Sequence, residues 1–157
     1  MKKEQLAYIA GFLDGDGSIM LQLRPRKLVN FGFRVRTIIC FYQDKRSKEG
    51  IFWIQKKLGV GYISIRNDNI VELRLEGHKR VKKILTELYP YIVFKKKQCC
   101  LILKAIEIMK KDFTARKLLD VCRISDEISS INYATTRKKY NYDFVKNVLI
   151  KKNLIPL

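Results

Sequence analysis

The chain has 157 residues, of which 47% are hydrophobic, so it is large and apolar enough for one globular domain with a buried core. There are 33 Lys and Arg residues against 15 Asp and Glu, a formal net charge of +18 that predicts a polyanionic partner. Nucleic acid is favoured over a membrane, because no apolar run approaches the roughly 20 residues of a spanning helix. One His and four Cys without a CxxC pair exclude zinc fingers and predict buried free thiols in a reducing compartment.

A helix and a hairpin are predicted first. Residues 5–14 are apolar and lack proline, and Gly15 and Gly17 are expected to end this helix. Apolar and polar residues alternate over 18–26 and over 31–42, the pattern of two half-buried strands joined by a short turn. The expected buried face of the second strand comprises Phe31, Phe33, Val35, Thr37, Ile39 and Phe41.

A second helix and hairpin follow, and then more helices. The helix is predicted over 46–58, with Phe52 on its apolar side and Gly59 at its C-terminal end. Strands are predicted over 62–66 and 71–76, with Ile63 and Ile65 on the buried face. The remaining helices are predicted over 78–89, about 96–111, about 115–131 and about 143–152. The fold class is therefore α+β: an αββαββα core over about 5–95 with an antiparallel four-stranded sheet, and extra C-terminal helices over about 96–152. All of it is expected to form a single domain, 1–157.

The polar face of the predicted sheet carries residue types that recognise DNA bases. Arg and Gln pair bidentately with guanine and adenine edges, and the first hairpin has no acidic residue on this face. A face charged only for solubility remains the alternative, although such faces usually mix signs. The predicted DNA-binding residues are Gln22, Arg24, Arg26, Arg34, Arg36, Tyr62, Ser64, Arg66, Glu72 and Arg74. Contacts to the DNA backbone are expected from Arg137, Lys138 and Lys139.

Asp14 and Asp16 stand among glycines at the end of the first helix, although the chain is strongly basic. An EF-hand loop starting at Asp14 is excluded, because its sixth position would be Ile19 and its twelfth Pro25. An ordinary Asp–Gly turn, core packing of the helix and metal-assisted phosphodiester cleavage remain as interpretations. Cleavage needs more carboxylates than one chain supplies here, so it predicts that two copies of the helix meet. The small residues that would allow this approach are Ala7, Ala10 and Gly11.

The segment 6–17 resembles the motif of the LAGLIDADG homing endonucleases, and especially of their small single-motif branch. The resemblance covers nearly the whole chain. It continues at Gly59-Val60-Gly61-Tyr62, Pro90-Tyr91, Lys97-Gln98, Asn132 and Thr136-Arg137-Lys138. It implies a homodimer in which the motif helices form the interface and each subunit contributes a saddle-shaped sheet. Asp14 is implied as a turn and interface residue.

The same resemblance implies catalytic residues and a cofactor. Asp16, with the carbonyl of Gly15 beside it, is implied to bind Mg²⁺, for which Mn²⁺ would substitute. Gln43 and Lys95 are implied to organise the attacking water, and which of the three lysines 95–97 is catalytic stays open.

The expected function is a sequence-specific homing endonuclease, encoded in an intron. It would make metal-dependent double-strand breaks in a long, near-palindromic DNA site as a homodimer. A strand of about 8 residues rises roughly 26 Å, so two subunits would read about 16–20 base pairs. The alternatives are a non-cleaving RNA maturase or DNA-binding protein of the same fold, and a basic ribosome-associated protein. The expected location is intracellular, in a chloroplast, a mitochondrion or the prokaryotic cytoplasm, with no membrane partner.

Overall fold

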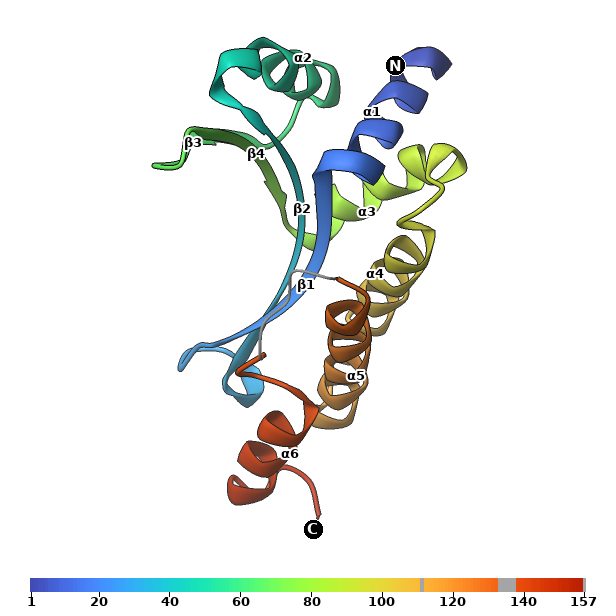
Figure 1. Ribbon diagram of the computed structural model, residues 1–157. Coiled ribbons are helices and arrows are strands. Elements are labelled where there is room, and N and C mark those ends of the chain that lie inside the picture. Colours follow the sequence, from blue (N-terminus) through green and yellow to red (C-terminus); the bar gives the residue numbers. More distant parts are fainter. Residues whose placement is uncertain (111, 133–137, 157) are drawn as a thin grey trace. The chain divides into compact units, whose positions relative to one another are not determined.

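The computed structural model describes residues 1–110, 112–132 and 138–156, and Figure 1 shows how their helices and strands follow one another. In chain order the elements are α1 (Lys3–Asp16), β1 (Gly17–Pro25), η1 (Asn30–Gly32), β2 (Phe33–Asp44), η2 (Lys45–Ser47), α2 (Lys48–Leu58), β3 (Tyr62–Ile65), β4 (Ile70–Glu76), α3 (His78–Leu88), η3 (Tyr89–Tyr91), α4 (Lys96–Ile108), α5 (Ala115–Ile131) and α6 (Tyr142–Lys151). The strands form one sheet in the order β1-β2-β4-β3. The predicted α+β class and the αββαββα order with further C-terminal helices are confirmed.

The chain divides into two compact units, each built from two separate segments. The first unit comprises Met1–Ile19 and Thr37–Cys99, and the second comprises Met20–Arg36 and Cys100–Leu157. Each strand of the first hairpin therefore contributes to both units. The single endonuclease domain over residues 1–157 stays a prediction.

In the first unit, the alternating strand residues form a buried sheet face. β4 pairs antiparallel with both β2 and β3, so Leu73 lies opposite Phe41 on one side and Ile63 on the other. α1 contacts α3, and both α2 and α3 contact β4. Each fully buried large apolar side chain contributes about 1.5–3 kcal/mol. In this unit such side chains include Ile9, Leu13, Ile39, Phe41, Leu73, Leu75 and Leu85.

In the second unit, capping residues explain where the last two helices begin. The side-chain oxygen of Thr114 accepts a hydrogen bond from the Lys117 amide at 3.2 Å, at the start of α5. The side chain of Asn141 accepts one from the Phe144 amide at 2.9 Å, at the start of α6. These bonds satisfy amides that have no partner within the helix. α5 and α6 contact each other (Figure 1).

Four local predictions need correction. α1 does not end at Gly15 but continues to Asp16. Phe31 is not in a strand: it lies in the η1 turn with a φ of 64°, and its ring centroid is 6.1 Å from that of Phe113. Phe52 is 46% exposed, because the buried positions of α2 lie on another side of the helix. Ile65 is 51% exposed, because it ends a short strand at the edge of the sheet.

Gly61, immediately before β3, is held in a conformation that other residues rarely adopt. Its φ is +97°, and a Cβ atom there would lie 2.8 Å from Cδ1 of Leu73 and 3.1 Å from the carbonyl oxygen of Arg74. We expect Gly61→Ala to lower the free energy of unfolding by about 2 kcal/mol, measured by urea denaturation. Gly50→Ala is the matched control, because that helical glycine has nothing within 4 Å of the added Cβ. It should stabilise the protein by about 0.5–1 kcal/mol. Equal stability of the two variants would contradict the steric argument.

Candidate active site

Asp16 is the exposed last residue of α1, and the chain enters β1 directly after it. Gly17 makes this sharp transition possible, because a Cβ atom there would lie 2.8 Å from the carbonyl oxygen of Leu13 and 2.9 Å from its Cα. The φ of Gly17 is −113°, which any residue can adopt, so close approach is what requires glycine. The carbonyl of Gly15 belongs to the last helical turn, where such groups lack helical partners. A carboxylate and a carbonyl oxygen thus lie at the negative end of the helix dipole, which favours a cation.

Asp14 lies only two residues earlier but has a different environment. Its carboxylate accepts hydrogen bonds from the backbone amides of Val93 at 2.6 Å, Phe94 at 3.2 Å and Lys95 at 3.0 Å. Asp14 is only 9% exposed. Its carboxylate therefore fastens the 93–95 segment to α1 inside the first unit, and does not point outward as an interface residue would.

Lys95 is brought to the acidic end of α1 by these bonds. Its Nζ donates a hydrogen bond to the main-chain carbonyl oxygen of Asp14. Burial lowers the pKa of Lys95, and the negative charges of Asp14 and Asp16 oppose this effect. Lys96 lies elsewhere, with its Nζ 5.2 Å from the centre of the Tyr89 ring. Of these two lysines, Lys95 is the one placed to act beside Asp16.

Gln43, near the end of β2, is half-buried and makes a local contact. Its Oε1 accepts a hydrogen bond from the amide of Asp44 at 2.8 Å. A neighbouring contact was not predicted from the sequence: the hydroxyls of Ser18 and Tyr42 lie 3.1 Å apart, which joins the start of β1 to the end of β2. Burial raises the pKa of Tyr42 to about 12, so this phenol stays protonated at neutral pH. Ser18 and Tyr42 both lie at even-numbered positions of strands in which the side chains alternate between the two faces of the sheet. This alternation was the sequence pattern that could have predicted the contact.

The donor atoms fit a hard divalent cation, but one chain offers few of them. Within residues 1–110, 112–132 and 138–156, no three His, Cys, Asp or Glu side chains gather closely enough to hold a metal ion. Asp16 and the Gly15 carbonyl are thus the donors available at this helix end. Mg²⁺ is commonly held by one or two carboxylates together with substrate phosphates and water. The single exposed carboxylate is consistent with a site completed by DNA and by a second copy of α1.

The outer side of α1 differs from the predicted interface. Ala10 has no exposed surface, so it packs inside the unit and cannot contact another chain. Ala7 and Gly11 are exposed, as is Gly15 one turn further on. A Cβ atom at either glycine would have nothing within 4 Å. Any close helix contact with a second copy would therefore run along Ala7, Gly11 and Gly15.

In the second unit, the residues predicted to read bases lie on β1 and β2, except Arg26, which directly follows β1. Arg24, Arg26 and Arg34 are exposed, whereas Gln22 and Arg36 are partly buried. Nε2 of Gln22 lies 3.6 Å from Sδ of Met20. Arg137 is outside the described residues. Lys138, expected to contact phosphate, forms an ion pair with Asp126 at 2.8 Å, and Lys139 beside it is exposed.

In the first unit, the predicted DNA-binding residues include a mixed-charge cluster. Tyr62, Ser64 and Arg66 are exposed, but Arg74 lies 3.4 Å from a carboxylate oxygen of Glu72 and 3.9 Å from one of Glu76. This cluster also includes Cys40, whose Sγ lies 3.4 Å from Oε1 of Glu72. Burial raises the pKa of the Cys40 thiol to about 11, so it stays neutral. These carboxylates hold Arg74 in place on β4.

Comparison with known proteins identifies the family. The family model described as LAGLIDADG endonuclease matches residues 9–106, more than half of the chain. The chain belongs to the LAGLIDADG endonuclease family. The recognition of this family from the motif is thereby confirmed, and so is an endonuclease as its class of enzyme. The ribosome-associated alternative is excluded.

Two curated DNA endonucleases show how far this LAGLIDADG chain resembles its relatives. I-CreI from Chlamydomonas reinhardtii is 34% identical over 137 residues, covering 87% of this chain and 83% of that protein. I-CvuI from Chlorella vulgaris is 28% identical over 124 residues, covering 79% of this chain and 77% of that protein. A crystal structure of I-CvuI in complex with the I-CreI target, in the presence of Mg, has a TM-score of 0.92 at 25% identity and covers 98% of each chain. No helix of the described residues is both long and apolar enough to span a membrane.

Proposed function

We propose that the protein is a homing endonuclease that acts as a homodimer. It cuts both strands of a long, near-palindromic duplex, with Mg²⁺ as its natural cofactor and Mn²⁺ able to substitute. The observation that carries this proposal is the arrangement at the end of α1, where Asp16 is exposed and Asp14 fastens the Lys95 segment beside it. The complexes of I-CvuI with DNA support it, because their structures were determined with Mg and with Ca.

Each residue of this site has a distinct part in the proposed reaction. Asp16 and the Gly15 carbonyl would hold the divalent cation, which when bound stabilises the charge that develops on the phosphate oxygens. Lys95 supplies positive charge to the same region. Because Lys95 is partly buried, its electrostatic interaction with nearby negative charge is stronger than it would be in water. Gln43 orients the attacking water through its amide, which cannot take up a proton at neutral pH.

The dimer and the location are further parts of the proposal. A symmetric pair of chains requires a DNA site with matching twofold symmetry, because each subunit reads one half-site. The exposed edge of Ala7, Gly11 and Gly15 supports a close contact between the two α1 helices. We place the protein inside the cell, in an organelle or a prokaryotic cytoplasm, and assign its gene to an intron.

Removal of divalent metal should abolish cleavage while DNA binding continues. Duplex DNA with a randomised central segment is first selected for binding in Ca²⁺, and the selected sequences are then incubated with the protein in Mg²⁺, in Mn²⁺ or in EDTA. We expect double-strand cleavage in Mg²⁺ and Mn²⁺, and cleavage at the background level in EDTA. The selected sites should be near-palindromic.

Two outcomes would contradict the proposal. Cleavage that persists in EDTA would exclude a metal-dependent reaction. A sequence that is bound tightly but never cut, in either Mg²⁺ or Mn²⁺, would instead indicate a maturase or a DNA-binding protein that does not cleave.

A further inference from the structure

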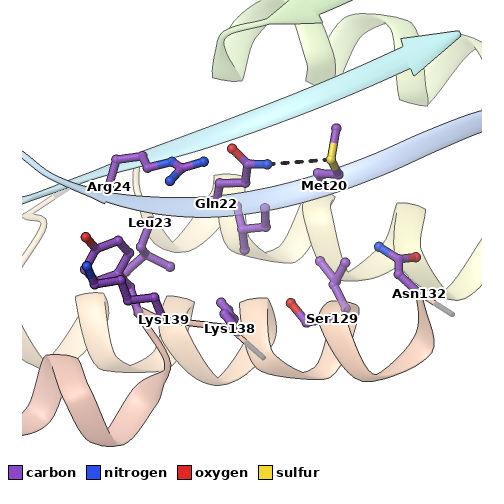
Figure 2. A pocket seen from close by; sticks show the side chains of 11 residues that line it. Met20, Gln22, Leu23, Arg24, Ser129, Asn132, Lys138 and Lys139 are labelled. Atoms are coloured by element: carbon purple, nitrogen blue, oxygen red, sulfur yellow. Dashed lines mark hydrogen bonds between the residues drawn. The ribbon is translucent and has the colours of Figure 1, made fainter. Parts of the chain in front are cut away.

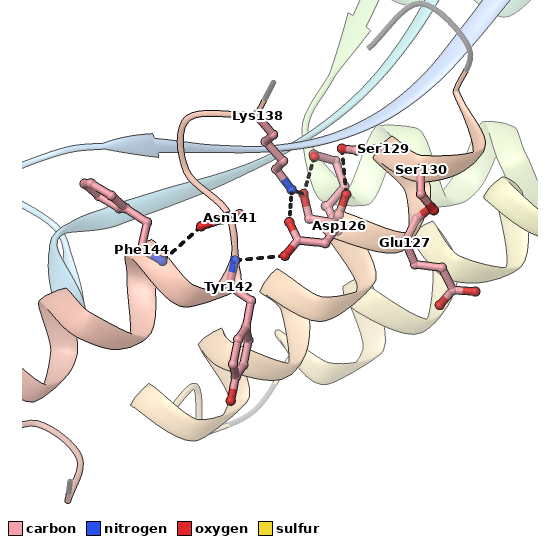
Figure 3. Close-up of polar contacts among 10 residues, drawn as sticks. Asp126, Glu127, Ser129, Ser130, Lys138, Asn141, Tyr142 and Phe144 are labelled. Carbon is pink, nitrogen blue, oxygen red and sulfur yellow. Dashed lines mark hydrogen bonds and ion pairs between the residues drawn. The ribbon is translucent and has the colours of Figure 1, made fainter. Parts of the chain in front are cut away.

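In the second unit, Asp126 on α5 binds both ends of the segment 138–142. One carboxylate oxygen accepts a hydrogen bond from Nζ of Lys138 at 2.8 Å. The other accepts one from the backbone amide of Tyr142, also at 2.8 Å, at the start of α6 (Figure 3). A single side chain thus closes this segment into a loop, hereafter the 138–142 loop.

Lys138 also connects the loop to strand β1. Its Nζ lies 2.6 Å from Oγ of Ser125, and that hydroxyl donates at 2.6 Å to the carbonyl oxygen of Leu21. Ser125 has no exposed surface, so water does not compete for these bonds. β1 lies at the edge of the sheet, where part of the strand's hydrogen-bonding capacity is open. Ser125 and Lys138 therefore attach the loop to the strand that carries Gln22 and Arg24.

Aromatic contacts hold the part of the loop that follows Lys139. The ring of Tyr140 lies 6.5 Å from that of Phe33 and 5.4 Å from that of Phe144, measured between centroids. Lys139 is exposed, with its Nζ 5.6 Å from the centre of the Tyr140 ring. Lys139 therefore lies between Lys138, which is held by an ion pair with Asp126, and Tyr140, which is held by ring packing.

A cavity of about 480 Å³ lies between β1 and this loop. Gln22 and Arg24 line it from the strand, and Lys138 and Lys139 line it from the loop (Figure 2). Three cationic side chains and no carboxylate stand among the lining residues that the structure describes. Its chemistry fits an anion. Because Lys138 is already paired with Asp126, the cations left for that anion are Lys139 and Arg24.

We propose that Asp126 is a positioning residue for DNA recognition: it closes the 138–142 loop so that Lys139 contacts a backbone phosphate of the duplex that β1 reads. This inference rests on the proposed function. Asp126 does not touch the DNA. It acts through Lys138 and the amide of Tyr142, and its effect appears at Lys139.

The proposal predicts an effect opposite to that of simple electrostatics. Asp126→Asn removes a negative charge from a protein that binds a polyanion, which alone would tighten binding. We expect binding to weaken about tenfold for each subunit of the dimer, the size of one lost charge-assisted hydrogen bond. Asp120→Asn is the matched control, because Asp120 lies on the same helix in an exposed ion pair with Arg123. It should bind DNA as tightly as the wild type or slightly more tightly.

The experiment measures the dissociation constant for a selected duplex in Ca²⁺ as a function of salt. Lys139→Gln should lower the slope of log K against log salt by about 1.8, because one phosphate contact is lost in each subunit of the dimer. In the Asp126→Asn background the same change should have almost no further effect, which a merely structural role of Asp126 would not produce. Asp126→Glu should restore part of the affinity.

Each remaining outcome is decisive. If the wild type binds no duplex, the proposed function fails and this inference with it. If the wild type binds and cuts DNA but Asp126→Asn behaves like Asp120→Asn, only this inference is overturned. If Asp126→Asn does not fold, Lys138→Gln replaces it, since it breaks the same ion pair and leaves the Tyr142 bond. A salt slope unchanged by Lys139→Gln overturns the inference whatever the other variants do.

Discussion

Replacing Asp16 with Asn should reduce DNA cleavage by about 10³-fold while leaving DNA affinity in Ca²⁺ within about twofold. Asp16 is the exposed carboxylate at the end of α1, and the nearby Asp14 is already engaged with three amides. A neutral amide binds a divalent cation much more weakly than a carboxylate does, so stabilisation of several kcal/mol in the transition state is lost. The measurement is single-turnover cleavage of a selected duplex in Mg²⁺.

Glu107→Gln provides the control for Asp16→Asn. It removes the same charge from an exposed residue of α4, Glu107, which forms an ion pair with Lys110 three positions along the helix. Cleavage by this variant should stay at the wild-type rate. If Asp16→Asn still cleaves at more than a tenth of the wild-type rate, Asp16 is not the metal ligand and the proposed mechanism fails.

Replacing Asp14 with Ala should have two effects at once. It should lower the free energy of unfolding by about 3–4 kcal/mol, and it should abolish DNA cleavage. The three amides of residues 93–95 would lose their common acceptor in a partly buried place. Lys95 would then no longer be held beside Asp16. Unfolding is measured in urea, and cleavage is measured at a temperature where the variant is still folded.

Asp68→Ala is the matched control for stability. Its carboxylate also accepts hydrogen bonds, but from the exposed Arg66 and from the amide of Ile70 in a surface turn. This change should cost less than about 1 kcal/mol. The role of Asp14 would be refuted if both variants were equally stable, or if Asp14→Ala cleaved DNA normally once folded.

Local sequence patterns predicted most of the fold because alternation and capping act over short distances. The helix over residues 115–131 was predicted at its observed bounds, and Thr114 shows why it begins there. Phe52 and Ile65 were misplaced for a different reason. A residue's apolar character does not reveal whether a neighbouring element covers it, and both residues lie where the described chain leaves them exposed.

The candidate site was predictable only in part. The motif pointed to Asp16, and the family resemblance pointed to Lys95 but left the choice among the three lysines 95–97 open. The contact between Asp14 and the amides of residues 93–95 had no local signal, since an acceptor for backbone amides leaves no pattern in the sequence. The same holds for Asp126, whose partners Lys138 and Tyr142 lie 12 and 16 positions away. In both cases, a carboxylate in a strongly basic chain was the one available hint.

The hydrogen bonds of Asp14 join residues that are 79 to 81 positions apart in the chain. Contacts of this kind form late in folding, because closing a large loop costs more entropy than forming a hairpin or a helix. The segment with Lys95 thus reaches the end of α1 only when the first unit is nearly complete. A nascent or partly unfolded chain would carry Asp16 without Lys95 beside it.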